Sequence, residues 1–282
     1  MVTANRERSD RCPGALRPWA ADDGLLVRLR LIGGRVSATS LRSLMSVAEE
    51  YGDGRIHLTS RTNLQIRALP SRDGRLPDEV LAAVEATGLL PSRAHDLVRN
   101  VMVSPQTGLA GGRADLRSVA AALDAALLAE PTLGELPGRF LFVLDDGRGD
   151  LLDRRCDLGL VAADAATCQL RIGDGHGPLV ALDHAAGELA ELGLRFLSRR
   201  GSGPTAAWHV RELPSELAAA SAPDPRLPRS VGPLAYGEVP GGHHLEVPEG
   251  LLDRALVDSL TSISEFLVVT PWRGVLVPGE PR

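Results

Sequence analysis

The sequence predicts an α+β protein made of short strands and amphipathic helices that are grouped into two or three units. Short runs of alternating or continuous apolar residues, typical of strands, lie between stretches whose apolar residues recur every three or four positions, as in helices. The pattern of residues 22–69 also recurs near the C-terminal end of the chain. With 282 residues, 44% of them apolar, the chain is long enough to bury several cores.

Residues 22–69 have the pattern of a strand, a helix and a strand pair. The expected elements are, in order, a half-buried strand (25–31), a helix that begins at Ser37 or Ser40 and ends at Gly52, and a strand pair (56–67). The helix has an apolar stripe of Leu41, Leu44, Met45 and Ala48. In the strand pair the odd positions are all polar, so that one face of the expected sheet is polar.

The middle of the chain, residues 76–215, is expected to form an α+β unit of its own. Its predicted elements are a helix (77–87), a helix capped by Asp115, an antiparallel meander of three strands (139–144, 158–162 and 168–172), a helix (183–198) and a strand near Trp208–Val210. A Pro-rich segment, residues 216–233, then has the composition of a linker.

The C-terminal segment, residues 234–282, repeats the opening pattern. An extended stretch (243–247) is followed by a helix with Leu252, Leu256, Leu260 and Ile263 on one face, and then by two strands. Leu58–Arg61 and Val269–Arg273 occupy equivalent places in the two copies. Each copy has too little apolar surface to offset its ordering entropy alone, so we expect residues 22–69 and 234–280 to form one composite unit.

Composition excludes several classes of protein. The net charge of −5 and the 3% of aromatic residues disfavour a nucleic-acid binder. The polar, Arg-rich first 20 residues do not resemble a signal peptide, and no apolar stretch is long enough for a transmembrane helix. Three scattered cysteines do not form a disulfide framework, so a cytoplasmic location is expected.

The main chemical feature is a strip of arginines in the first unit. Residues 1–75 hold 13 Arg against 8 Asp and Glu, a net charge of +5, and all 31 basic residues of the chain are Arg. Arg28 and Arg30 share one face of a predicted strand, and Arg61 and Arg67 share one face of another, with His57, Asn63 and Gln65 as further hydrogen-bonding groups. Four guanidiniums on one surface suit an anionic ligand with carboxylates, and the alternative is an ordinary solvated sheet face.

Other candidate groups are weaker when each is taken alone. Arg99-Asn100 precedes an apolar run, and Arg139 follows Pro137-Gly138; both patterns also fit residues that merely begin strands. The pair Cys156 and Cys168 has no neighbouring Cys or His at the spacing of metal ligands, so no metal site is predicted. The glycines at residues 108–112 lack the spacing of a nucleotide-binding loop.

Taken together and in this order, these motifs resemble the nitrite/sulfite reductase superfamily. Gly33-Gly34 and the run His57–Arg67 resemble its ferredoxin-like half-domain, and Thr270–Gly274 resembles the second half-domain. The runs Val98–Val101, Ser104–Gly108 and Leu136–Phe140 resemble its sirohaem-associated domain. Arg11–Gly14 and Gly111–Arg117 are closest to the precorrin-3B synthase branch of the superfamily.

The resemblance implies a fold, a cofactor and a set of contacts. The implied organisation is a ferredoxin-like half-domain (16–75), a nitrite/sulfite reductase-type α+β domain (76–215), a linker (216–233) and a second half-domain (234–282). The implied cofactors are sirohaem and a 4Fe–4S cluster, and the implied function is that of a precorrin-3B synthase-like oxidoreductase of tetrapyrrole biosynthesis, or of a nitrite or sulfite reductase. The contacts it implies for the tetrapyrrole or a small anionic substrate are Arg30, Arg61, Arg99, Asn100 and Arg139, with Arg28, Asn63 and Arg67 as further candidates.

Two departures from the family pattern leave the activity open. The family holds its cluster with C-x5-C and C-x3-C after the second half-domain, and this sequence contains no such pair, so no cluster is expected within this chain. A second basic residue is expected two positions after Arg139, where this sequence has Leu141. Three alternatives follow: a truncated gene product, one half of a split enzyme whose partner chain carries the cluster domain, and a non-catalytic tetrapyrrole-binding protein.

Overall fold

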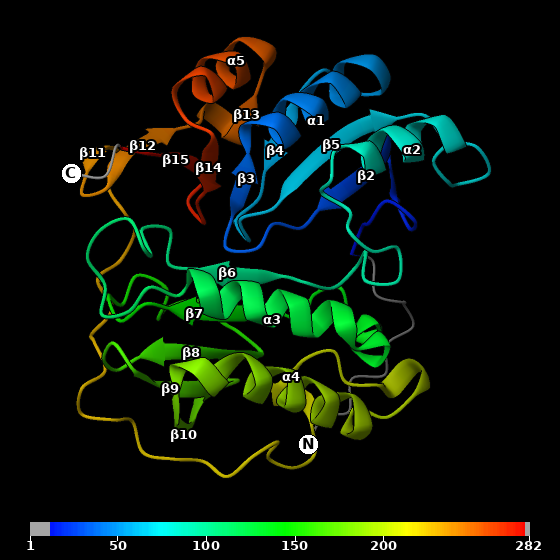
Figure 1. Cartoon of the computed structure of the whole chain (residues 1–282). Coiled ribbons are helices and arrows are strands. Elements are labelled where there is room, and N and C mark those ends of the chain that lie inside the picture. Colours follow the sequence, from blue (N-terminus) through cyan, green and yellow to red (C-terminus); the bar gives the residue numbers. More distant parts are fainter. Residues whose placement is uncertain (1–11, 280–282) are drawn as a thin grey trace. The chain divides into compact units, whose positions relative to one another are not determined.

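The structure is a computed structural model that describes residues 12–279 of the chain. Its described residues divide into two compact units, which are treated separately below (Figure 1). The first consists of residues 12–96 together with 234–279, and is called the composite unit. The second consists of residues 97–233, and is called the middle unit. Residues 12–96 and 234–279, which contain the two copies of the sequence repeat, therefore share one unit, as the repeat predicted.

The composite unit contains two five-stranded antiparallel sheets. The first sheet has the order β1 (Trp19–Ala21), β2 (Gly24–Leu29), β5 (Leu64–Leu69), β4 (Ile56–Leu58) and β13 (Leu251–Leu252). The second has the order β11 (Gly237–Val239), β12 (Gly242–Glu246), β15 (Gly274–Pro278), β14 (Phe266–Val269) and β3 (Arg35–Ser37). The two orders are the same except for the last strand, which each sheet takes from the other copy of the repeat.

This exchange of strands ties the two copies together. From the first copy, β3 pairs with β14, and from the second copy, β13 pairs with β4. One shared core then lies under both sheets and includes Leu29, Ile66, Leu252 and Val275 among its buried members. Each copy has too little apolar surface for a core of its own, but the two copies together have enough for one core. This is the physical reason that they fold as one unit.

The helices of the composite unit cover this core. They are α1 (Ala38–Tyr51), α2 (Asp78–Ala86) and α5 (Arg254–Ile263), and α1 and α5 lie side by side (Figure 1). The Ser37 side chain caps α1 and Gly52 ends it, as predicted. The predicted stripe of α5 is wrong at both ends, because Leu252 belongs to β13 and Ile263 is 68% exposed. Leu260 is buried as predicted, and Val257 lies on the buried face as well.

The middle unit has one mixed five-stranded sheet with two helices packed on it. The strand order is β10 (Gly175–Ala181), β9 (Thr167–Ile172), β8 (Leu158–Ala162), β7 (Phe142–Asp145) and β6 (Val101–Val103). Helices α3 (Arg117–Ala129) and α4 (Leu182–Arg199) lie side by side along the sheet (Figure 1). Four 3-10 turns complete the described chain: Pro131–Glu135, Gly203–Thr205 and Val210–Glu212 here, and Pro248–Gly250 in the composite unit.

Two expectations for the middle unit are wrong. The strands β7 and β8 run parallel, so the three predicted strands are not an antiparallel meander. The link of residues 146–157 is long enough to return the chain to the starting edge of the sheet, which a short turn could not do. The predicted strand at Trp208–Val210 is a loop entering a 3-10 turn, because the Glu212 carboxylate accepts the N–H groups of Trp208 and His209.

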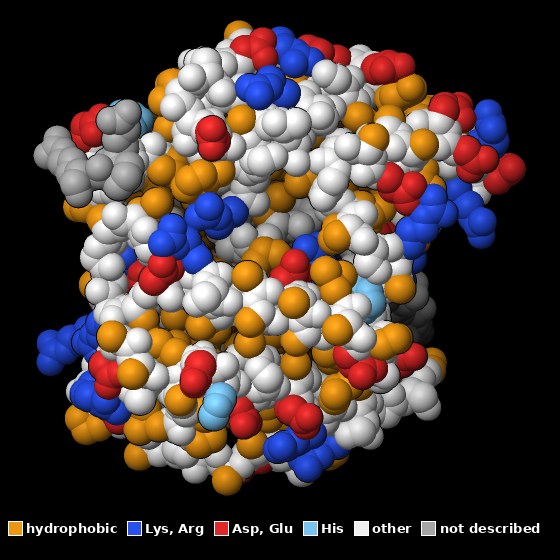
Figure 2. All heavy atoms as spheres, viewed as in Figure 1, with side chains coloured by type: hydrophobic (Ala, Val, Ile, Leu, Met, Phe, Trp, Pro, Cys, Tyr) orange, Lys and Arg blue, Asp and Glu red, His pale blue; other side chains and the backbone are white. Residues whose placement is uncertain are grey.

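The surface is mixed in charge. On the face shown in Figure 2, arginine side chains lie near acidic ones in most places. Among the helices that the structure describes, none is both long and apolar enough to cross a bilayer.

Candidate functional site

A polar row crosses the first sheet of the composite unit. Arg28, Gln65 and His57 face one another in register on β2, β5 and β4, on the face opposite the apolar core. The Arg28 guanidinium donates two hydrogen bonds to Gln65 Oε1, at 3.0 and 2.6 Å. His57 Nε2 lies 2.7 Å from Asp53 Oδ2. Arg28 thus bonds to a neutral amide rather than to a carboxylate.

Arg61 lies beside this row. Burial lowers the pKa of Arg28, and the positive charge of Arg61 lowers it further. Two guanidiniums that repel each other in a partly buried place are stabilised when an anion binds near them. Among the arginines of the predicted strip, Arg61 is the one whose charge acts on Arg28.

Arg30 does not belong to an open strip. It follows the end of β2 and is only 4% exposed. Its guanidinium donates to the carbonyls of Asp96 at 2.6 Å and Pro13 at 3.2 Å. The Asp96 carboxylate in turn accepts the N–H groups of Ala15 and Leu16. Arg30 therefore anchors the segment around Pro13-Gly14; Arg11, the first residue of the predicted Arg11–Gly14 motif, lies outside the described residues.

Arg67 is paired with an acid. Its guanidinium forms two hydrogen bonds to the Asp23 carboxylate, at 3.1 and 3.2 Å, and this bond raises the pKa of Arg67. The β2–β5 ladder shifts register between its Val27 and Leu25 pairs, at the end of the sheet where Arg67 lies. Of the four guanidiniums expected on one surface, Arg30 is thus buried and bonded to backbone carbonyls, and Arg67 is paired with an acid.

Asn63 supports the turn that carries Arg61. It is fully buried, and its Oδ1 accepts the N–H of Leu31 at 3.0 Å. The Thr59 hydroxyl accepts the N–H groups of Arg61 and Asn63, at 3.3 and 3.0 Å. Thr62, between them, has a φ of 57°. Asn63 therefore holds the turn in shape rather than lying on an open surface.

In the middle unit, Asn100 and Arg139 lie together. Asn100 is 1% exposed, and its Nδ2 donates to the carbonyls of Gly138 at 3.0 Å and Phe140 at 3.3 Å, on either side of Arg139. The Arg139 guanidinium carbon lies 4.3 Å from the centre of the Trp208 ring. Asn100 therefore fixes the turn from which Arg139 projects.

Arg99 is held by an acid of its own unit. Its guanidinium bonds to Asp124 of α3 through two contacts, Nε–Oδ1 at 2.5 Å and Nη2–Oδ2 at 3.0 Å. Its backbone has a φ of 74°, a conformation that a non-glycine residue rarely adopts. The sequence did not single out Asp124, because a lone acid on a helix face has no distinctive pattern.

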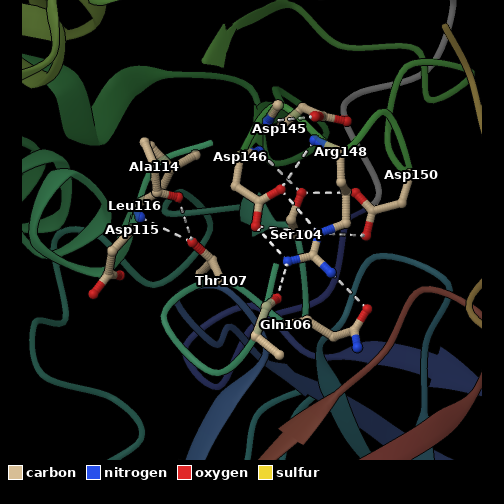
Figure 3. Close-up of polar contacts among 12 residues, drawn as sticks. Ser104, Gln106, Thr107, Ala114, Asp115, Leu116, Asp145, Asp146, Arg148 and Asp150 are labelled. Carbon is tan, nitrogen blue, oxygen red and sulfur yellow. Dashed lines mark hydrogen bonds and ion pairs between the residues drawn. The ribbon is translucent and has the colours of Figure 1, made fainter. Parts of the chain in front are cut away.

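The predicted Ser104–Gly108 motif belongs to a loop that is pinned by a polar cluster (Figure 3). Ser104 Oγ donates to Asp150 Oδ1 at 2.7 Å and accepts the N–H of Asp146 at 3.1 Å. The Arg148 guanidinium bonds to Asp146, to Gln106 Oε1 at 2.6 Å and to the carbonyl of Ala110 at 2.7 Å. Arg148, which lies in the segment that follows β7, thus holds this loop in place.

The same cluster contains buried carboxyl groups. Asp145 accepts the N–H groups of Gly147, Gly149 and Leu151, at 2.9, 2.9 and 3.0 Å. Burial raises the pKa of Asp150 to about 7, and the charges of Asp145 and Asp146 act in the same direction, against the Ser104 hydrogen bond and the charge of Arg148. This cluster was not predicted, although the sequence has a signal for it in three acids and an arginine within residues 145–150.

Neither the cysteines nor the acids suggest a metal centre. The chain has three cysteines, all of them buried, while a 4Fe–4S cluster uses four thiolates. Burial raises the pKa of Cys156 to about 11 and of Cys168 to about 12, which keeps both thiols protonated. Within residues 12–279, no three His, Cys, Asp or Glu side chains are grouped so that they could hold a metal ion. The residues present do not fit a 4Fe–4S cluster.

Comparison with known proteins places one segment in a family. Residues 20–73 match the family model of the nitrite/sulfite reductase ferredoxin-like half domain. The matched segment contains Arg28, Arg61 and the turn that Asn63 supports.

Two curated proteins are similar over longer stretches. A precorrin-3B synthase of Sinorhizobium sp is 29% identical over 163 residues, which cover 56% of this chain and 32% of that protein. A ferredoxin–nitrite reductase of Synechococcus elongatus is 34% identical over 130 residues, or 44% of this chain and 25% of that protein. The matched regions thus span about a third or less of these relatives.

The fold resembles a solved structure more completely. The structure of the Mycobacterium tuberculosis NirA protein superposes on 94% of this chain and 59% of that chain, with a TM-score of 0.67 and 15% sequence identity. The chain therefore has an α+β fold with three sheets that is similar to that of NirA.

Proposed function

We propose that this chain binds a tetrapyrrole and that it does so through the carboxylates of the tetrapyrrole. The premise is that residues 20–73 belong to the nitrite/sulfite reductase ferredoxin-like half-domain family. The observation that carries the proposal is the pair of guanidiniums of Arg28 and Arg61 beside the polar row of the first sheet. A carboxylate offsets the repulsion of two neighbouring cations and accepts hydrogen bonds from the planar edge of each.

The repeat gives independent support. The turn at Thr270 and the turn at Thr59 have equivalent hydrogen bonds. The Thr270 N–H donates to the carbonyl of Gly274, just as the Thr59 N–H donates to the carbonyl of Asn63. At the equivalent positions the second copy has His244 where the first has Arg28, and Trp272 where the first has Arg61. The fold therefore does not itself require these two arginines, which favours a ligand as the reason for them.

The tetrapyrrole that the family resemblance suggests is sirohaem, whose iron would supply redox chemistry when it is bound. In the composite unit the donor set fits its carboxylates, because Arg28 and Arg61 would hold them. In the middle unit, taken by itself, the proposed contact for a tetrapyrrole or a small anionic substrate is Arg139. Asn63 and Asn100 would keep the turns of Arg61 and Arg139 in place. Three other arginines would stabilise the fold and would not contact the ligand, because groups of the chain bond to them. Backbone carbonyls bond to Arg30, Asp23 bonds to Arg67, and Asp124 bonds to Arg99.

The activity that goes with this binding is a second part of the proposal. We favour a precorrin-3B synthase-like role in tetrapyrrole biosynthesis, because that relative matches the longer stretch of this chain. A nitrite or sulfite reductase-like role is the alternative. Since the three cysteines of this sequence do not fit a 4Fe–4S cluster, either redox role would need cluster ligands that these 282 residues do not supply, and without them the chain would act as a tetrapyrrole-binding protein. We take residues 234–282 to be the second ferredoxin-like half-domain.

The test is a binding titration with sirohaem and with its metal-free form. An Arg–carboxylate bond that is partly shielded from water contributes roughly 1.5–3 kcal/mol, so Arg61→Ala is expected to weaken binding about ten- to a hundredfold. Arg61→Lys keeps the charge without the planar fork and recovers only part of the loss. The control is Arg72→Ala, whose side chain is 69% exposed. Equal dissociation constants for wild type and Arg61→Ala would refute the proposal.

A further inference from the structure

A buried carboxylate joins two segments of the middle unit around Arg139. Asp157 is 3% exposed and precedes β8. Its Oδ2 accepts the N–H of Leu141 at 2.9 Å, two residues after Arg139. Its Oδ1 accepts the N–H of Val210 at 3.0 Å and lies 3.1 Å from Nδ1 of His209. Asp157 thus connects the turn of Arg139 to the segment that follows Trp208.

Both segments are fixed by further contacts. Next to Arg139, the Phe140 ring is buried against Phe196 of α4, with 4.8 Å between the ring centres. Asn100 holds the carbonyls on either side of Arg139. On the other segment, the Glu212 carboxylate accepts the N–H of Trp208 at 2.7 Å. The Trp208 ring and the Arg139 guanidinium, 4.3 Å apart, therefore meet between two anchored stretches of backbone.

We propose that Trp208 and Asp157 are positioning residues that orient Arg139 for a ligand carboxylate, an inference that rests on the proposed tetrapyrrole-binding function. A ring beneath a guanidinium attracts the cation and restricts its plane. The N–H groups of a stacked guanidinium lie along its edges, which is the direction from which a carboxylate forms two parallel hydrogen bonds. Asp157 sets the relative position of ring and guanidinium, because it bonds to the backbone of both segments.

His209 has a different place in this arrangement. Its imidazole faces the Asp157 carboxylate, and its backbone N–H points to Glu212 at 3.4 Å. Two acids beside it disfavour the approach of a further anion. The ligand carboxylate is therefore assigned to Arg139, and His209 to the support of Asp157.

The test compares substitutions of Trp208 that differ in one property. Phe keeps an aromatic face, while Leu fills space without one. In titrations of the full chain with metal-free sirohaem, we expect Trp208→Leu to weaken binding about three- to tenfold and Trp208→Phe to weaken it less. In the Arg139→Ala background, Trp208→Leu should have no further effect, because the guanidinium that it positions is gone.

Asp157→Asn tests the second positioning residue. An amide can accept one of the two N–H groups with its oxygen, but its nitrogen cannot accept the other. We expect weaker binding in the wild-type background, no further loss with Arg139→Ala, and a changed near-ultraviolet circular dichroism signal from Trp208 in a chain that carries Trp19→Phe and Trp272→Phe.

The outcomes separate this inference from the proposed function. Equal binding by wild type, Trp208→Leu and Asp157→Asn, together with weaker binding by Arg61→Ala, overturns the inference and leaves the proposed function standing. Trp208→Phe and Trp208→Leu could instead lose equal affinity, and lose it in the Arg139→Ala background as well. Trp208 would then act through packing alone, and this result also overturns the inference. Absence of binding to the wild type overturns both.

Discussion

The buried carboxyl group of Asp150 links proton uptake to the stability of the middle unit. Its pKa in the folded chain is about 7, above the ordinary value of 3.8, mainly because of burial. A group with a raised folded pKa contributes stability that is fully present below its unfolded pKa and is lost as the pH rises through its folded pKa. The Asp150 contribution is therefore complete below about pH 4, declines most steeply between about pH 4 and pH 7, and is mostly lost by about pH 8.

We predict that the free energy of unfolding falls by about 1.4 kcal/mol between pH 6 and pH 8 on account of this one group. Asp150→Asn should remove that part of the pH dependence, while its amide oxygen still accepts the Ser104 hydrogen bond. Urea unfolding of both chains at the two pH values measures the difference. An unchanged pH dependence in Asp150→Asn would show that Asp150 is not the titrating group.

At the residue scale, the sequence did not predict the contacts that hold the candidate residues in place. Buried side chains such as Asn63 and Asn100 bond to backbone groups far along the chain, and such partners have no local pattern. Arg99 and Arg67 are likewise bonded to acids that only the fold brings near them. Alternation along a strand shows on which face of the sheet a side chain lies, but not which other groups pack on that face.

At the scale of elements, the exchange of β3 and β13 between the two sheets depends on one close approach. Gly34 has a φ of +72°, its carbonyl accepts the N–H of Val269, and a Cβ added to it would lie within 2.1 Å of the Val269 carbonyl oxygen. Only glycine fits there without moving β14 away from β3. Gly54 has nearly the same φ, +73°, but open space around it.

We predict that Gly34→Ala destabilises the composite unit by about 2–5 kcal/mol, from backbone strain together with the steric clash. Gly54→Ala is the matched control and should cost only the strain, about 1–2 kcal/mol. Equilibrium unfolding in urea gives both values. Equal losses for the two substitutions would mean that the contact between Gly34 and Val269 is not tight.

Periodicity predicted most elements and failed where pairing was not local. The helices α1 and α4 have long apolar stripes, and their predicted bounds are close to those in the structure. The strand β10 contains glycines and a proline, and β13 has only two residues, so neither has a strand pattern. The direction of β8 relative to β7 depends on the path of residues 146–157, which alternation does not encode.

At the scale of the whole chain, the composite unit needs both ends of the sequence. A chain that ends at Pro233 lacks the second sheet except β3, and also lacks β13 and α5. We predict that residues 12–96 then lose their protection from hydrogen exchange, because eight of the 27 buried residues of the shared core are missing. Residues 97–233 provide the internal control, since their own sheet is intact. Protection of α1 and β5 equal to that in the full chain would contradict the composite unit.

The composite unit could be predicted from the repeat, because two small copies of one pattern can bury enough apolar surface only together. The candidate site was predictable in its chemistry, through arginine content and motif resemblance. Which guanidiniums lie together depends on register shifts and on the acids of other elements, and these arise from the fold as a whole.

The central claim is that the arginines of this chain recognise the carboxylates of a tetrapyrrole, and the ligand itself offers the most direct test. The measurement compares the dissociation constants of metal-free sirohaem and of the same macrocycle with its carboxylates converted to neutral amides, at one salt concentration. The amide form keeps the ring but cannot form charge-assisted bonds, so we predict that it binds at least about a hundredfold more weakly than the carboxylate form. Equal affinity for the two forms would contradict the account.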